Sequence, residues 1–219
     1  MTAGEFIAAL DVEHQRLLRG LEPDATLTPE LEGPLNVPSL LKVALRNELE
    51  ATEIAARWLV TTDDVPLKLA LARQVGDEAR HYRLIGERLG QLGVDAAAVD
   101  PLAGGYGPLF RYLDTLTSSV ERVAAGQFTR EAIAVVKNRQ FIEFCERVGD
   151  TETAALYRDT IEPDERYHHE LGRRFLLRLA TTPDSQAAAA AAARRTLALA
   201  EELQKKALAT AGIHHAPGC

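Results

Sequence analysis

Two short segments of this sequence place a histidine three residues after a glutamate, and in both an aspartate immediately precedes the glutamate. They are Asp77-Glu78-Ala79-Arg80-His81 and Asp164-Glu165-Arg166-Tyr167-His168. Residues three apart lie on one face of a helix, so each Glu and His can bind the same metal ion. A single pair of this kind is more often a surface contact than a pair of ligands. Its duplication, on segments whose apolar residues recur in the same phase, favours a metal site.

Two more carboxylates fall on the apolar faces of other segments. Glu48 follows Leu41 and Leu45 at helical spacing, and Glu131 follows Phe128 in the same way. Burying a charge is costly unless something neutralises it. Four carboxylates and two imidazoles suit a pair of Fe or Mn ions, whose charge of about +4 offsets the charge of the ligands. The predicted metal ligands are Glu48, Glu78, His81, Glu131, Glu165 and His168.

Several neighbouring groups leave alternatives open. Glu50 is the second choice to Glu48, although its helical phase points it away from the leucines. Asp77 and Asp164 either orient the ligating histidines or lie in solvent. His169 points about 100° away from His168, so we expect it beside the site or at the surface.

The remaining candidates have simpler explanations. Glu53, Glu143 and Glu146 are expected in solvent or next to ligands. His14 is expected to be an exposed or a core histidine, and His214 and His215 fall in a tail. The tyrosines at helical spacing are expected to pack in the core; these are Tyr82, Tyr112, Tyr157 and Tyr167.

The elements that must position these residues are helices, because prolines separate long segments in which strand patterns are nearly absent. Capping boxes at Thr2 and Ser118 begin two of the helices. A kink or break is expected at Pro163. The Ala-rich segment has little apolar bulk, so it is expected to be peripheral. The predicted helices cover 2–20, 39–61, 66–90, a short segment after 108, 118–149, 151–180 and 185–210, with loops at 21–38 and 93–107.

The predicted ligands lie at matching levels of two antiparallel helix pairs. Glu48 is about 15 residues before the turn at 63–64, and Glu78 is about 15 residues after it. In the second pair, Glu131 is 18 residues before Gly149 and Glu165 is 16 residues after it. The difference corresponds to about 3 Å along the helix axis, which a kink or a bulge can absorb.

Composition limits the class of protein. The chain has 219 residues, a net charge of −7 and 46% hydrophobic residues, as expected for one domain with a real core. No apolar run approaches the ~20 residues of a membrane-spanning helix. Two cysteines and the absence of an export signal favour the cytoplasm. We expect a single domain over 1–219, with the bundle at about 39–180, an N-terminal helix and loop at 1–38, and a C-terminal helix and tail at 181–219.

The order of these motifs resembles an uncharacterised bacterial family of the ferritin-like superfamily. The resemblance runs through 48–55, Asp77 to His81, 130–132, 149–150, and Asp164 to His168 with Gly172, and it covers about 40–180. Rubrerythrins and the ferritin-like tRNA hydroxylase are more distantly similar. The resemblance implies an all-α, ferritin-like antiparallel four-helix bundle, with additional N- and C-terminal helices and a dinuclear non-haem site at the six predicted ligands.

The leading hypothesis is an oxidoreductase with two Fe ions, or with Mn at one or both positions, that activates O2 or peroxide to oxidise or hydroxylate an unidentified small substrate. Iron handling or peroxide scavenging is the second hypothesis, and it predicts little space beside the metals. A metal-free structural or partner-binding bundle is the third. Other expected partners are an electron donor and a second copy of the chain in a homodimer. tRNA is a weaker alternative, because the net charge is acidic and only Arg166, Arg173, Arg174 and Arg178 form a local basic group.

Overall fold

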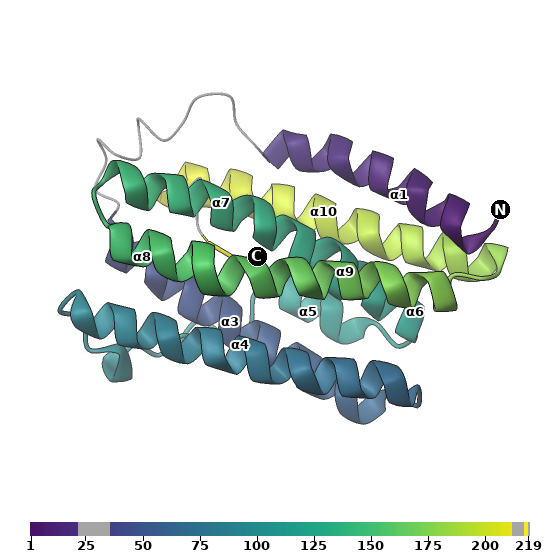
Figure 1. Ribbon diagram of the computed structural model, residues 1–219, viewed down its shortest axis with the longest axis horizontal. Helices are drawn as coiled ribbons and strands as arrows, with labels where there is room; N and C mark the ends of the chain where they lie inside the picture. Colours follow the sequence, from purple (N-terminus) through teal and green to yellow (C-terminus); the bar gives the residue numbers. More distant parts are fainter. Residues whose placement is uncertain (22–35, 212–216, 219) are drawn as a thin grey trace.

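The computed structural model describes residues 1–21, 36–211 and 217–218. Within these ranges the regular structure is helical and includes no strand, which confirms the all-α prediction (Figure 1). Across the same ranges, no helix combines the length and the apolar character needed to cross a membrane. Most of the predicted loop at 21–38 and the tail residues His214, His215 and Cys219 lie outside the described residues.

The first helix pair consists of α3 (Val37–Thr61) and α4 (Val65–Gln91), which pack against each other along their length. Helix α3 begins two residues earlier than predicted, because Asn36 caps it by accepting a hydrogen bond from the Ser39 N–H at 3.0 Å. Asp64 caps α4 in the same way through the Leu67 N–H, at 2.9 Å. The turn is therefore only three residues long, as the predicted antiparallel pair requires.

The second pair is longer and contains two π-helical segments. Its first arm runs through α6 (Ser119–Val123), η3 (Ala124–Arg130) and α7 (Glu131–Arg147), and it begins with the predicted capping box of Ser118 and Glu121. The chain turns at Gly149, whose φ of +82° favours glycine. Its second arm runs through α8 (Thr151–Leu156), η4 (Tyr157–Ile161) and α9 (Glu162–Leu179).

The π segments occur close to the two predicted irregularities. A bulge near Gly126 was the alternative to a kink at Pro163, and the chain there forms η3, all seven of whose residues are buried. Near Pro163 the helical course continues, but the hydrogen-bond pattern changes in η4, just before this proline, which has no N–H to donate. In η3, the Thr129 hydroxyl donates to the Ala124 carbonyl at 2.6 Å. A side chain therefore satisfies a carbonyl within the irregular segment.

Helices α1 (Ala3–Leu18) and α10 (Pro183–Ala211) flank the second pair, on the side away from α3 and α4 in Figure 1. The Ala-rich helix lies outside the four long arms, as predicted, but the expectation that it contributes little to the core is wrong. Helix α10 packs on η3, and Ala189, Ala193 and Leu197 are almost completely buried. Small side chains let the two backbones approach closely, so low apolar bulk did not mean low burial.

The short elements complete the fold. They are η1 (Arg19–Leu21), η2 (Ala96–Ala98) and α5 (Pro108–Thr115), and the last of these follows the Gly-rich connection and packs on α3 and α10.

The two larger apolar clusters fill the bundle and leave a polar layer between them. One cluster contains Leu45, Ile85 and Tyr157, and the other contains Trp58 and Phe175. Along each of the four long arms, the predicted ligands fall between residues of these two clusters. The fold thus places one buried polar layer part-way along the bundle.

Candidate metal centre

The structure brings all six predicted ligands into this layer, and each has an exposed fraction of 3% or less. Their ligand atoms form two groups, within each of which all atoms lie within 4.8 Å of one another. The first group contains Glu48, Glu78, His81 and Glu165, and the second contains Glu78, Glu131, Glu165 and His168. Glu78 and Glu165 belong to both groups, so the arrangement is that of two adjacent cation positions with two shared carboxylates.

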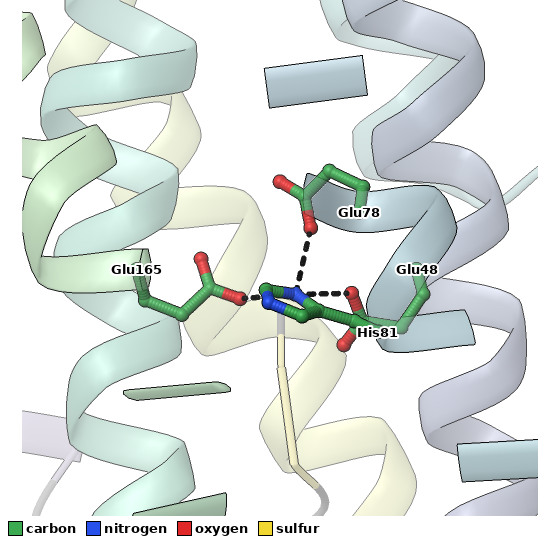
Figure 2. A group of neighbouring side chains, drawn as sticks. All are labelled: Glu48, Glu78, His81 and Glu165. Carbon is green, nitrogen blue, oxygen red and sulfur yellow. Dashed lines mark ion pairs between the residues drawn. The ribbon is translucent and has the colours of Figure 1, made fainter. Parts of the chain in front are cut away.

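Each shared carboxylate directs one oxygen to each histidine. The Glu78 oxygens lie 3.4 Å from His81 Nδ1 and 3.6 Å from His168 Nδ1. For Glu165 the corresponding distances are 3.8 Å and 3.7 Å. Figure 2 shows Glu48, Glu78 and Glu165 converging from three helices on the His81 ring, with Glu48 3.4 Å from the same nitrogen.

The outer nitrogens of the two histidines are held by a crossed pair of aspartates. His81 Nε2 lies 3.0 Å from Asp164, which precedes Glu165, and His168 Nε2 lies 3.1 Å from Asp77, which precedes Glu78. An Nε2–H that donates to a carboxylate leaves the Nδ1 lone pair directed inward. The aspartates of the two motifs therefore orient the histidines, which was one of the two alternatives drawn from the sequence.

The inward atoms have no hydrogen-bond partner in the described part of the chain. They are His81 Nδ1, His168 Nδ1 and Glu165 Oε2, all of them buried. A buried polar atom without a partner costs about 1–3 kcal/mol. A divalent cation at the centre would satisfy these lone pairs and carboxylate oxygens at once, so the donor set fits a metal ion such as Fe or Mn.

In the metal-free protein, burial and the mutual repulsion of the carboxylates shift their pKa values. Burial raises the pKa of Glu48 to about 7, although His81 opposes the shift, and burial together with Glu165 raises the pKa of Glu131 well above its usual value. Burial also acts to raise the pKa of Glu78, but His81 and the charge of His168 outweigh it, so the pKa of Glu78 is lowered.

The histidines respond in the opposite sense to burial. Burial alone would lower the pKa of His81, but the carboxylates of Glu48 and Glu78 raise it to about 12. The pKa of His168 is also raised, because Asp77 and Glu165 outweigh its burial. In the metal-free protein, protons on the histidines therefore take the place that cations would fill.

Gln74 and Arg130 contact the candidate ligands, and the sequence analysis gave neither of them a role. Gln74 Nε2 donates to Glu131 Oε1 at 2.7 Å and to Glu78 Oε1 at 3.2 Å. Gln127 holds Gln74 by donating to its Oε1 at 2.8 Å. Arg130 Nη1 donates to the same oxygen of Glu131 at 3.3 Å. The detectable signal was the position of Gln74, one turn before Glu78 on a face that is otherwise apolar.

Glu50 is buried but does not join the six residues. Its carboxylate accepts the Gly107 N–H at 2.7 Å and the Arg46 Nε–H at 3.0 Å. Glu50 also lines a small hollow beside Arg130, with a cavity volume of about 10 Å³ and walls from α3 and α5. The space suits a guest of about the size of one water molecule.

The other candidates have structural partners. His14 is a core histidine whose Nε2 lies 3.1 Å from the Thr129 hydroxyl. His169 is half-buried, and its Nδ1 lies 2.7 Å from the Phe128 carbonyl, so it sits beside η3. Glu143 is exposed, as expected, whereas Glu53 accepts a hydrogen bond from Tyr106.

Glu146 and the four tyrosines lie outside the cluster of six residues. Glu146 pairs with Arg158 in an exposed contact. Tyr157 is fully buried in the core, and its hydroxyl has no partner in the described ranges. The other tyrosines are half-buried and contact apolar side chains; these are Tyr82, Tyr112 and Tyr167.

No family model, no curated protein and no solved structure matches this chain. The description of the protein therefore rests on its own geometry. It is an all-helical bundle with a buried cluster of glutamates and histidines that resembles a carboxylate metal site.

Proposed function

We propose that this chain is a ferritin-like protein in which the buried cluster binds two Fe ions, or Fe and Mn. The single observation that carries this proposal is that the inward nitrogens of His81 and His168 are buried, have no hydrogen-bond partner in the described residues, and face carboxylate oxygens. Lone pairs and anionic oxygens that face one another are stabilised when a cation lies between them.

The geometry supports a specific division of the ligands. One position would use Glu48 with His81, and the other would use Glu131 with His168, while Glu78 and Glu165 would serve both. Bridging carboxylates typically hold two ions about 3.5–4 Å apart. The four carboxylates balance two divalent charges, which makes such a site compatible with burial.

Two redox-active metal ions in such a site supply the chemistry that reduces O2 or peroxide. The chain contributes the setting for it. The two apolar clusters exclude water on both sides, and the aspartates fix the histidine rings. The protons that His81 and His168 hold in the metal-free protein would leave when the ions bind, so binding should release protons.

The size of the nearby hollow bears on the substrate. It is lined by Arg130, which contacts Glu131, and it has room for about one water-sized guest. The hollow is too small for an organic molecule, and none of the six candidate ligands lines it. A hollow this small is what the second candidate function predicts, which is peroxide scavenging or iron handling without an organic substrate.

A role in tRNA modification receives less support. Three of the four arginines of the local basic group form ion pairs with carboxylates of the chain, namely Arg166, Arg173 and Arg178, whereas Arg174 lies over the Tyr167 ring. An electron donor, a homodimer and a cytoplasmic location remain part of the proposal. Retention of tRNA at low salt would support the modification of tRNA, and the absence of retention would eliminate it.

The proposed function is tested by anaerobic loading with Fe(II) followed by rapid mixing with O2 or with H2O2. Loaded wild-type protein should oxidise its iron much faster than free Fe(II), with an absorbance change and consumption of the oxidant. Glu165→Ala should abolish this rate, whereas Glu143→Gln, at an exposed glutamate of the same bundle, should retain it. Oxidation no faster than that of free Fe(II) would refute the redox function. A metal-free protein as stable as the loaded one would support a purely structural bundle.

A further inference from the structure

The two carboxylates that belong to only one group each, Glu48 and Glu131, have unequal surroundings. Glu131 Oε1 accepts two hydrogen bonds, one from the Gln74 amide at 2.7 Å and one from the Arg130 guanidinium at 3.3 Å. Apart from the candidate ligand His81, whose Nδ1 lies 3.4 Å from Glu48 Oε2, no N–H or O–H of the described residues donates a hydrogen bond to the Glu48 carboxylate. The two halves of the centre are otherwise alike.

This difference affects how well each carboxylate can bind a cation. A carboxylate has about four lone-pair sites, and hydrogen bonds from an amide and a guanidinium occupy sites that a metal could use. The Arg130 charge also repels a cation held by Glu131. Glu48 keeps both oxygens for a metal ion, whereas Glu131 effectively offers one.

The side chain of Gln74 is held in one orientation beside the carboxylates. It is 2% exposed, and its Oε1 accepts a hydrogen bond from Gln127, which fixes the amide so that its nitrogen points at the carboxylates. The same nitrogen reaches Glu78 Oε1 at 3.2 Å. Gln74 thus touches one shared carboxylate and the carboxylate of the second position.

We propose that the two metal positions are unequal and fill in order, with the Glu48 and His81 position binding more tightly than the Glu131 and His168 position. Gln74 is the positioning residue that sets the difference. This inference rests on the proposed function, because it concerns the same site. It means that the second ion is the exchangeable one, which would allow a different metal at that position.

The order is tested by titrating metal-free protein with Mn(II) and following free Mn(II) by its electron paramagnetic resonance signal. Wild type should bind two ions in two steps whose affinities differ by about tenfold or more. Glu48→Ala should remove the tighter step, and Glu131→Ala should remove the weaker one. Two equal affinities, or a tight step that survives Glu48→Ala, would overturn the inference. Failure to bind any Mn(II) or Fe(II) would instead refute the metal site itself.

The role of Gln74 needs a separate variant. Gln74→Leu removes the N–H that occupies a lone pair of Glu131, so it should tighten the weaker step by up to about tenfold and bring the two affinities together. Gln186→Leu is the matched control, because Gln186 is also a buried glutamine but donates to the Met1 and Ala180 carbonyls. The control should leave both steps unchanged. An unchanged or widened gap in Gln74→Leu would show that Gln74 does not set the difference.

Discussion

Replacing Glu48 by glutamine should change stability in opposite directions in the metal-free and the metal-loaded protein. In the metal-free protein, the cost of burying the Glu48 carboxylate outweighs its attraction to His81, so a neutral isostere should relieve a net penalty. In the loaded protein, the same change removes a ligand. A residue with a purely structural role would not show this reversal of sign.

The magnitude follows from the pKa of Glu48, which is about 7 in the folded protein against an ordinary value of 4.5. Between these two values the folded state holds a proton that the unfolded chain has released. The contribution of Glu48 to the stability of the metal-free protein therefore falls as the pH rises from 4.5 to 7, and above pH 7 its full penalty is present. At about 1.36 kcal/mol per pKa unit, the penalty is about 3 kcal/mol.

The assay is urea unfolding at pH 8, followed by circular dichroism, with and without saturating Mn(II). Metal-free Glu48→Gln should be about 3 kcal/mol more stable than metal-free wild type, and the gain in stability on adding Mn(II) should be much smaller than in wild type. Glu50→Gln is the control, because Glu50 is a buried glutamate of the same helix with its own donors. Its effect should not depend on Mn(II). A metal-free Glu48→Gln protein less stable than wild type would refute the reasoning.

Three further predictions concern the supporting residues. Asp164→Asn or Asp77→Asn should weaken metal binding by about 10–100-fold, measured by competition with a chelator, with little change in the helical content of the protein. Gly172→Ala should lower the free energy of unfolding by about 3 kcal/mol, because the new Cβ would lie 2.5 Å from a backbone nitrogen of η3. The control is Gly76→Ala, which should not destabilise the protein because a Cβ at this position has no neighbour within 4 Å. Burial lowers the pKa of His14 from 6.5 to about 4, so its contribution to the free energy of unfolding should fall by about 3 kcal/mol as the pH falls through this range. In His14→Gln this contribution should be absent when the free energy of unfolding in urea is measured at several pH values.

The helices, and the positions of the candidate ligands along them, could be predicted because the relevant sequence signals are local. Capping residues at Thr2 and Ser118 mark helix starts, and the distance of Glu48 and Glu78 from one short turn fixes their common level. The packing of α10 could not be predicted in this way. Its buried alanines gain their place from the close approach of η3, and that approach is a tertiary property that propensity does not encode.

The six residues of the cluster could be named from the sequence because charged residues on an apolar helical phase need a reason to be buried. Their division into two groups could not, since it depends on how Glu78 and Glu165 rotate between the two histidines. Gln74 was missed for a related reason. A single glutamine on an apolar face is compatible with many partners, and only the arrangement of α4 against η3 and α7 selects Glu131.

The most direct test of the central claim is the metal content of the purified chain, measured by elemental analysis after loading with Fe(II) or Mn(II) under anaerobic conditions and removal of unbound ions. Wild type should retain two ions per chain. Glu78→Ala, which removes a shared carboxylate, should retain fewer than one. Wild type that keeps well under one ion per chain, or a Glu78→Ala variant that keeps as much metal as wild type, would contradict the assignment of this cluster as a dinuclear metal centre.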